Sequence, residues 1–355
     1  MDPRLEAYAR LLVDCISPKP GWQVIVRSQP PGRPLVEEVS RELARRGARA
    51  LVRLAFDGVG GIFVREAPLE VLGTLSDIER HEIETMDSYM AMLAPENTRA
   101  GSDVPAERLG LRQQALRTPH EPFLRDEKPW VGCYCATEAV AQDAGMTVHA
   151  FEDFLYGAVL IDWEALRQTM ERIAERFDRA ETVRIVGDGT DLTFSLAGRQ
   201  GKIDALGANM PGGEVFYSPV EDSAEGVISY SEYPACYLGH EVPGVRLRFE
   251  QGRIVDASAT GDEAFLVGTL DSDEGARRLG EFGIGCNPGI RRHMKNTLFD
   301  EKIEGTVHFA VGTGFPQLGG TNRSGIHWDM VKELRKGGRI EIDGEVVQES
   351  GTWRL

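Results

Sequence analysis

The sequence predicts two domains: an α/β N-terminal domain with a mainly parallel sheet, and an α+β C-terminal domain with a curved, largely antiparallel β-sheet or barrel. Three observations support this prediction. The chain has 355 residues, more than one hydrophobic core usually organises. Helical and extended patterns alternate as far as residue 180, whereas short alternating runs separated by glycine turns fill residues 181–355. We therefore place the boundary between residues 180 and 181.

The N-terminal half alternates helices with strands. The predicted strands are residues 22–28, 48–56, 87–97 and 130–135, and the predicted helices are residues 5–15, 33–47 and 106–116. This order predicts a parallel sheet with helices on both faces. No glycine-rich phosphate loop follows these strands, and we interpret the pair Gly60 and Gly61 as a turn.

Residues 139–180 are predicted to form linker helices that end the N-terminal domain. One apolar stripe recurs there at spacings of three and four, and Asp162 precedes it as a helix cap. We interpret the stripe as core packing; it consists of Trp163, Leu166, Met170, Ile173 and Phe177.

The C-terminal half is predicted to be mainly β. Residues 182–199, 225–235 and 244–259 alternate apolar and polar side chains, and the last run forms a hairpin about Gln251 and Gly252. A helical insertion is expected near residues 271–279.

Composition argues against nucleic-acid and membrane partners. The 56 acidic and 40 basic residues give a net charge of −16, which repels phosphate backbones and anionic membranes. No stretch approaches the roughly 18 uncharged apolar residues of a membrane span, and residues 1–12 do not resemble a signal peptide. We expect a cytoplasmic location. Of the five cysteines, Cys133 and Cys135 are interpreted as small buried apolar side chains.

Polar groups suited to chemistry concentrate in the second half of the chain. In SGIHWDMV, residues 324–331, a β-strand would place His327 and Asp329 on one face and Trp328 on the other. Burying an imidazole and a carboxylate is costly unless they pair or bind something. The other candidates are Glu214 after a Pro-Gly-Gly turn, Glu281 and His308, each in apolar or glycine-rich sequence.

These five residues form a ligand set suited to one or two divalent cations such as Zn, Co, Mn or Fe. Taken singly, each has a structural alternative. Glu214 could be a surface acid, and His308 could be a hydrogen-bonded core residue. Spacing alone leaves these alternatives open.

The order of the motifs resembles the thermophilic metalloaminopeptidase family that includes aminopeptidase T and aminopeptidase S, which is leucyl aminopeptidase-like. The motifs are TDLTFSLAGR, NMPGGEVFYSP, RRLGEFGIGCNPG, NTLFDEKIEGTVHFAVG and NRSGIHWDMV. The resemblance implies a homodimer of two-domain subunits that binds two divalent metal ions (Zn, Co or Mn) and removes N-terminal residues from peptides.

Transferred by motif, the resemblance implies that Glu214 and Glu281 are metal ligands, one of them also acting as general base, and that His308, His327 and Asp329 complete the ligand set. Such a centre would activate a water molecule, and a carboxylate would accept its proton.

The family also has a tyrosine seven residues after the first of these histidines, where this chain has Phe315. Phenylalanine keeps the ring but can neither ligate a cation nor donate to an oxyanion. Tyr217 is an alternative source of a hydroxyl group. Phe315, Arg291 and Lys295 are candidate substrate-binding residues, although the two basic residues could equally lie on a solvated loop.

A second hypothesis comes from a related enzyme class. His308, His327 and Asp329 alone match the set that holds non-haem Fe(II), so a ring-cleaving dioxygenase of the 2,5-dihydroxypyridine type, acting on a small-molecule substrate, is the alternative. Glu214 and Glu281 favour the peptidase, because a single iron would not need them, whereas Phe315 favours the dioxygenase. A non-catalytic binding module would leave five ionisable groups without a role.

Overall fold

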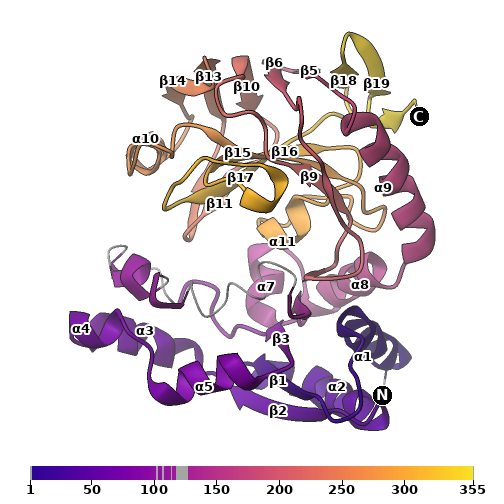
Figure 1. The fold of residues 1–355 in the computed structure, drawn as a ribbon, viewed down its shortest axis with the longest axis vertical. Coiled ribbons are helices and arrows are strands. Elements are labelled where there is room, and N and C mark those ends of the chain that lie inside the picture. The colour runs from indigo at the N-terminus through magenta and orange to yellow at the C-terminus, as the bar shows by residue number, and fades with distance from the viewer. Residues whose placement is uncertain (1, 101–102, 106–107, 113, 117–126, 355) are drawn as a thin grey trace. The chain divides into compact units, whose positions relative to one another are not determined.

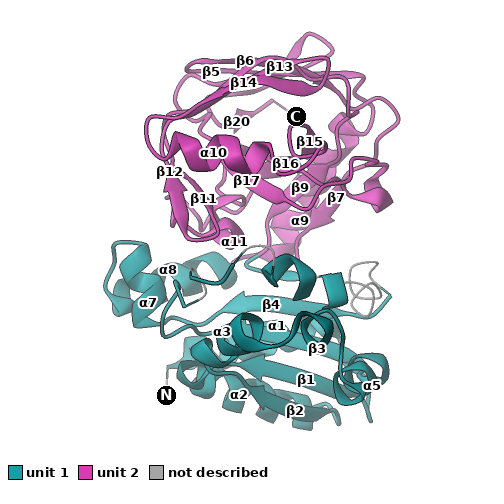
Figure 2. Cartoon of the chain, turned by 90° about the vertical axis from the view of Figure 1, so that its left-hand side faces the viewer, with its two compact units in different colours: residues 1–160, 206–211 teal, residues 161–205, 212–355 magenta. Residues whose placement is uncertain are grey.

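The computed structural model describes residues 2–100, 103–105, 108–112, 114–116 and 127–354. The chain divides into two compact units (Figure 2): unit 1 comprises residues 1–160 and 206–211, and unit 2 comprises residues 161–205 and 212–355. The domain boundary at residues 180 and 181 stays a prediction. The chain first passes from unit 1 to unit 2 between residues 160 and 161.

Unit 1 contains a five-stranded parallel sheet in the order β2-β1-β3-β4-β8. Its strands are β1 (Gln23–Ser28), β2 (Arg49–Leu54), β3 (Ser88–Leu93), β4 (Trp130–Tyr134) and β8 (Asn209–Met210). On β1, Val24 and Val26 are fully buried on one face and Ile25 is almost fully buried on the other. Both faces are therefore covered, which confirms the predicted parallel α/β arrangement.

Helices cover this sheet. They are α1 (Pro3–Ile16), α2 (Arg33–Arg45), α3 (Asp57–Glu66), α4 (Leu69–Leu72), α5 (Asp77–Thr85), α7 (Glu138–Asp143) and α8 (Val148–Val159). The interpretation of Gly60 and Gly61 as a turn is wrong, because both lie inside α3. The helix expected around residues 106–116 includes residues outside the described ranges, and residues 108–112 and 114–116 are helical.

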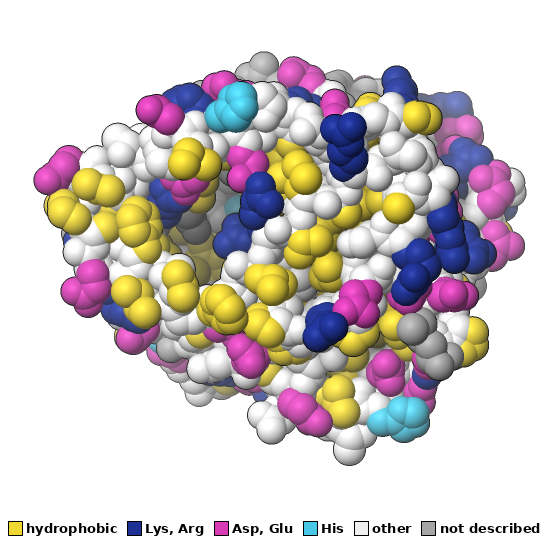
Figure 3. Space-filling model, turned by 90° about the horizontal axis from the view of Figure 1, so that it is seen from below, with side chains coloured by type: hydrophobic (Ala, Val, Ile, Leu, Met, Phe, Trp, Pro, Cys, Tyr) yellow, Lys and Arg dark blue, Asp and Glu magenta, His cyan; other side chains and the backbone are white. Residues whose placement is uncertain are grey.

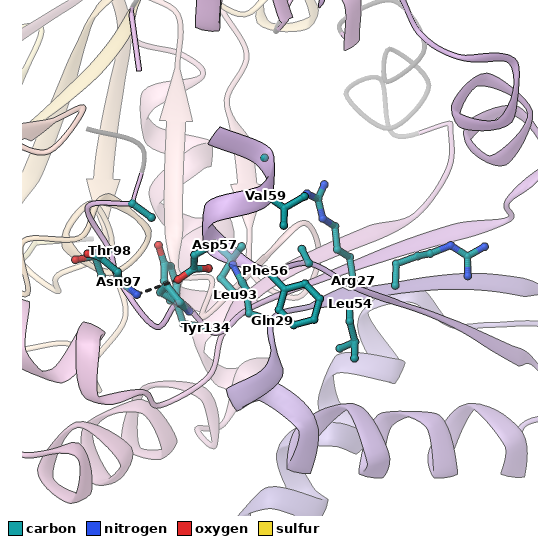
Figure 4. Close-up of a pocket in the computed structure, with 15 residues that line it drawn as sticks. Arg27, Gln29, Leu54, Phe56, Asp57, Val59, Leu93, Asn97, Thr98 and Tyr134 are labelled. Carbon is teal, nitrogen blue, oxygen red and sulfur yellow. Dashed lines mark hydrogen bonds between the residues drawn. The ribbon is translucent and has the colours of Figure 1, made fainter. Parts of the chain in front are cut away.

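A hollow of about 580 Å³ lies at the carboxyl ends of the parallel strands (Figure 4). Asp57 lines it and accepts hydrogen bonds from the main-chain N–H groups of Glu96 and Asn97 at 2.7 and 2.9 Å. This carboxylate therefore fixes the loop after β3.

The face seen from below also shows a hollow bordered by hydrophobic side chains (Figure 3). Exposed apolar residues of unit 1 include Leu54, Phe56, Val59 and Ile62.

Unit 2 is built on antiparallel sheets (Figure 1). The eight-stranded sheet has the order β14-β13-β10-β6-β5-β18-β19-β20, the five-stranded sheet the order β17-β16-β15-β9-β7, and β11 pairs with β12. Their bounds are β5 (Thr182–Gly187), β6 (Thr190–Ser195), β7 (Lys202–Asp204), β9 (Glu214–Tyr217), β10 (Glu225–Tyr230), β11 (Ala235–Tyr237), β12 (His240–Val242), β13 (Val245–Glu250), β14 (Arg253–Ser258), β15 (Leu279–Gly285), β16 (Val307–Gly312), β17 (His327–Lys332), β18 (Arg339–Ile342), β19 (Glu345–Glu349) and β20 (Thr352–Trp353). The predicted antiparallel architecture is confirmed; the strands form two large open sheets and the β11-β12 pair rather than a closed barrel.

Aromatic rings pack the two large sheets together. Phe194 of β6 lies 4.9 Å from Phe282 of β15 and 5.4 Å from Phe309 of β16, measured between ring centroids. Helix α9 (Trp163–Phe177) packs beside β7 and β9 and adds Phe177 to this core, 5.8 Å from Phe282. All five residues of its predicted apolar stripe are buried, and the Asp162 side chain caps it through the N–H of Ala165. The opposite face of the five-stranded sheet is thereby left for polar side chains.

Two local predictions for unit 2 had different outcomes. The hairpin about Gln251 and Gly252 is confirmed, since both have positive φ between β13 and β14. The helix expected near residues 271–279 is wrong. Helix α10 spans Glu263–Leu270, and turns follow it, where the Asp273 side chain accepts a hydrogen bond from the N–H of Ala276.

Among the described residues, no helix has both the length and the apolar composition needed to cross a bilayer.

Candidate metal centre

The five candidate ligands lie on one face of the five-stranded sheet. Phe282 and Phe309 pair across β15 and β16 and point into the aromatic core, so their neighbours Glu281 and His308 point to the opposite face. The next strand continues this pattern, because Asp329 pairs with Ala310 and His327 with Gly312. Strand alternation therefore gathers residues that are distant in sequence.

Glu214 reaches this face from a tight turn. It begins β9 and pairs with Gly285 of β15. The preceding Gly213 has a φ of 116°, and a Cβ atom there would lie 2.7 Å from the Cβ of Asn287. The Pro-Gly-Gly turn is therefore needed for a close backbone approach, as expected of glycine at positive φ.

The ligand atoms form two groups, each within 4.8 Å. The first group comprises Glu214, Glu301 and His308, and the second comprises Glu281, His327 and Asp329. In the second group, His327 Nε2 lies 3.0 Å from Glu281 Oε2 and 3.6 Å from Asp329 Oδ1. Each group offers one imidazole and two carboxylates, a donor set that suits a divalent transition metal.

Glu281 lies between the two groups. Its Oε1 is 3.4 Å from His308 Nε2, while its Oε2 is 3.0 Å from His327 Nε2. His308 Nε2 is also 3.4 Å from Glu214 Oε2 in the first group. The two oxygens of Glu281 thus face different imidazoles, so one oxygen would be available to each group.

Outer contacts orient one of the imidazoles. The Nδ1–H of His327 donates to the carbonyl oxygen of Thr313 at 3.0 Å. Because a carbonyl can only accept, Nδ1 carries the proton and Nε2 is left unprotonated for a cation when the ring is neutral. Such a backbone partner is typical of metal-binding histidines.

Two buried oxygens without hydrogen-bond partners indicate that the site suits cations. Glu214 Oε2 and Asp329 Oδ1 are buried and have no hydrogen-bond partner in the described part of the chain, and they belong to different groups. Buried carboxylate oxygens are rarely left without a donor, because desolvation is costly. Both groups therefore fit divalent cations.

The pKa values reflect the crowding of charge when no cation is present. Burial opposes ionisation of Glu281, but hydrogen bonds from His308 and His327 outweigh it and hold the Glu281 pKa at about 2. Burial opposes the charged form of both imidazoles, yet the neighbouring carboxylates raise the pKa of His308 to about 9 and that of His327 to about 10. Burial also raises the pKa of Asp329 to about 6. The metal-free centre therefore retains protons that metal ions would displace.

Glu301 and Lys302 are additional residues of the centre that the sequence did not single out. Glu301 belongs to the first group, and burial raises its pKa to about 7. Lys302 is fully buried; its Nζ lies 3.1 Å from Glu214 Oε1 and forms an ion pair with Glu301 Oε1. In the sequence FDEKIEG, these residues resemble an exposed charged turn; the full burial of Lys302 and the partial burial of Glu301 appear only in the fold.

Phe315 lies beside the second group. Its ring packs edge-on against His327 at a centroid distance of 5.3 Å and against Phe216 at the same distance. Its N–H donates to Ser218 Oγ at 2.9 Å, which fixes the loop. The alternative hydroxyl, that of Tyr217, is fully buried and donates to Asp178 at 3.0 Å in the packing with α9. Tyr217 is therefore not positioned to replace the missing hydroxyl.

The two basic candidates are not in contact with either ligand group in the described part of the chain. Arg291 is exposed and donates from Nε to the carbonyl of Pro288. Lys295 is also exposed and forms an ion pair with Glu241 at 2.7 Å. Their substrate-binding role stays a prediction.

Comparison with known proteins consistently finds metalloproteases and aminopeptidases as the similar proteins. The model of a family described as thermophilic metalloprotease (M29) matches residues 1–353. Aminopeptidase AmpS of Bacillus subtilis (strain 168) is 26% identical over 351 residues, covering 88% of this chain and 84% of that protein. Aminopeptidase T of Thermus aquaticus is 29% identical over 294 residues, covering 70% of each chain.

Two solved structures share the fold. Wild-type AmpT from Thermus thermophilus superposes with a TM-score of 0.82 at 24% identity, covering 99% of both chains. A 2,5-dihydroxypyridine dioxygenase from Pseudomonas putida KT2440 superposes with a TM-score of 0.63 at 13% identity, covering 98% of this chain and 96% of that one. The folds of unit 1 and unit 2 are thus found in solved structures.

Proposed function

The chain belongs to the thermophilic metalloprotease (M29) family, and from this membership we propose that it is a metal-dependent aminopeptidase that removes N-terminal residues from peptides. The observation that carries the proposal is the pair of adjacent ligand groups with Glu281 between them. Zn, Co and Mn all suit these nitrogen and oxygen ligands. The roles of the individual residues are part of the proposal.

Bound divalent ions supply Lewis-acid polarisation of the peptide carbonyl and activation of water at neutral pH. Glu214, Glu301 and His308 would hold one ion, and His327 and Asp329 the other. Glu281 would contribute one oxygen to each group, because its oxygens face different imidazoles.

A carboxylate of the two ligand groups would accept the proton from water, because these are the carboxylates beside the proposed ions. The motif resemblance offers Glu214 and Glu281 for this role, and the first ligand group also includes Glu301.

Hydrolysis assays test this proposal. Metal-free protein reconstituted with Co²⁺, Zn²⁺ or Mn²⁺ should cleave aminoacyl anilides and short peptides that have a free amino terminus. The same peptides with an acetylated amino terminus are the control and should stay intact. Failure to cleave any member of a broad peptide panel with all three metals would refute the proposal.

The dioxygenase alternative receives less support from the geometry. A single iron held by His308, His327 and Asp329 needs these ligands in one group, but the two imidazoles belong to different groups. The likeness to a dioxygenase structure concerns the fold alone. Oxygen uptake with dihydroxylated pyridines, by protein loaded anaerobically with Fe²⁺, would reverse this preference.

We also propose a homodimer in the cytoplasm. The apolar side chains of Leu54, Phe56, Val59 and Ile62 on unit 1 are each more than half exposed, a pattern common at subunit contacts. All five cysteines lie in the described part of the chain and none forms a disulfide. Light scattering after size exclusion should give twice the subunit mass of 39.1 kDa. A mass of one subunit would refute the dimer.

A further inference from the structure

A lysine occupies the interior of the proposed metal centre. Lys302 has no exposed surface, and its Nζ contacts Oε1 of both Glu214 and Glu301. Lysine is almost never fully buried unless its charge is paired. Both carboxylates with which it forms ion pairs belong to the first ligand group, so the ammonium is already a cation of that group.

From this geometry, and building on the proposed two-metal centre, we propose that Lys302 makes the two ligand groups unequal. The first group would bind its divalent ion more weakly than the second, so the two ions would load in sequence.

Charge balance is the first reason. With neutral imidazoles and ionised carboxylates, the Lys302 ammonium offsets one of the two negative charges that Glu214 and Glu301 would offer to the first ion. Within the described part of the chain no lysine or arginine pairs with Glu281 or Asp329, and Glu281 faces both groups, so its charge does not distinguish them. Because interactions between charges strengthen in a buried environment, one unit of charge changes cation affinity substantially.

Oxygen availability is the second reason. Lys302 engages Oε1 of both glutamates, which leaves one oxygen of each for a metal. The free Glu214 Oε2 faces His308, at 3.4 Å from Nε2. The lysine therefore restricts the first group to one oxygen per carboxylate, whereas no such restriction applies to Asp329.

A purely structural role for Lys302 predicts the opposite effect of its removal. If the lysine only held Glu214 and Glu301 in position, its loss would let both ligands move and would weaken binding to the first group. If it acts as a competing cation, its loss would strengthen that binding. The direction of the change in affinity therefore distinguishes the two roles.

Calorimetric titration of metal-free protein with Mn²⁺ tests the inference without measuring activity. The wild-type chain should show two classes of site whose dissociation constants differ at least ~10-fold. In Lys302→Met, the weaker class should tighten at least ~10-fold while the tighter class changes little. Two equal classes in the wild type, or a weaker class that weakens further in the variant, would overturn the inference.

A matched control is available in the same unit. Lys332 is also fully buried, but its Nζ donates to Glu232 and to the carbonyl of Asp188, away from the ligand carboxylates. Lys332→Met should leave both Mn²⁺ classes unchanged. An equal tightening in this control would assign the effect to loss of any buried lysine and would overturn the inference.

Two ligand variants keep the test decisive if circular dichroism shows that Lys302→Met does not fold. Asp329→Asn should remove the tighter class, and Glu301→Gln should remove the weaker one; the reverse assignment would overturn the inference. Peptide hydrolysis is scored separately. Unequal classes without hydrolysis refute the proposed function alone, and hydrolysis with two equal classes refutes this inference alone.

Discussion

At the scale of single residues, the centre depends most on Glu281. One side chain faces both imidazoles through different oxygens, so its amide analogue would replace an anionic oxygen in each group with a weaker or repelling atom. We expect Glu281→Gln to lower kcat/KM at least ~100-fold and to lower metal content, with the far-UV circular dichroism unchanged. Glu274→Gln, an exposed residue of the same unit, is the control and should match the wild type. Unfolding of Glu281→Gln would indicate a structural role instead.

Phe315 stands where the resembling family has a tyrosine, so one substitution adds the hydroxyl oxygen that this chain lacks. Its ring packs beside His327, so a tyrosine hydroxyl there would add a hydrogen-bond donor near the second ligand group. We expect Phe315→Tyr to raise kcat by ~10-fold or more with a smaller change in KM, since an added oxyanion donor acts mainly in the transition state. Phe216→Tyr adds the same hydroxyl to the neighbouring ring and should not give this gain. Equal rates for both variants and the wild type would show that the hydroxyl is unimportant here.

Single residues also show where sequence reasoning ends. His327 and Asp329 were predictable because strand alternation places them on one face and their apolar neighbours on the other. Trp328 was expected on that other face, and its ring stacks against Tyr237. Glu301 and Lys302 were missed because an acid next to a lysine in a turn is usually exposed. The full burial of Lys302 and the partial burial of Glu301 result from packing around the end of the short helix α11 (Thr297–Asp300), which no local pattern records.

At the scale of elements, the centre depends on the register of β15 against β16. Gly283 pairs with His308, and a Cβ atom at Gly283 would lie 2.0 Å from both Cε1 and Nε2 of the imidazole. The glycine therefore provides the space that His308 occupies. The glycine-rich sequence GEFGIG does not reveal the reason for this glycine, which is evident only from the pairing.

We therefore predict that Gly283→Ala displaces His308 while β15 stays in the sheet. Metal content should fall by about one ion per chain and hydrolysis by ~100-fold, as measured by elemental analysis and peptide assay. Gly268→Ala in α10 is the matched control, because no atom lies within 4 Å of its Cβ position, and it should be neutral or slightly stabilising. Full metal content in Gly283→Ala would show that His308 is not a ligand.

At the scale of the whole molecule, the sequence predicted the type of sheet in each unit better than it predicted which residues belong to each unit. Alternating helix and strand patterns are local, so the parallel and antiparallel sheets could be anticipated from them. Strand β8 could not, because it comes from residues 206–211, which return to the sheet of unit 1 from within the sequence of unit 2. The error at residues 271–279 has a similar origin, since Gly275 is held against the carbonyl of Arg323, far along the chain.

The stability of the whole chain should depend on pH, and this dependence should differ between the metal-free and the metal-bound protein. In the metal-free protein, the raised pKa values of His308 and His327 contribute stability that is complete below pH 6.5 and is lost as pH rises through about 9 and 10. The raised pKa values of Asp329 and Glu301 act in the same direction, with loss as pH rises through about 6 and 7. Glu281 acts oppositely. Its lowered pKa contributes stability that is complete above pH 4.5 and is lost only as pH falls towards 2.

We therefore expect the melting temperature of chelator-treated protein to fall from pH 6 to pH 9. Metal ions bind neutral imidazoles and ionised carboxylates, so the rise in melting temperature on adding Mn²⁺ should be larger at pH 9 than at pH 6. Thermal unfolding followed by circular dichroism at pH 6.0, 7.5 and 9.0 measures both effects. His327→Gln removes one titrating imidazole and should flatten the metal-free pH dependence. A metal-free melting temperature that rises over this range would contradict the charge arrangement, because the buried imidazoles and carboxylates would then not share protons as their contacts require.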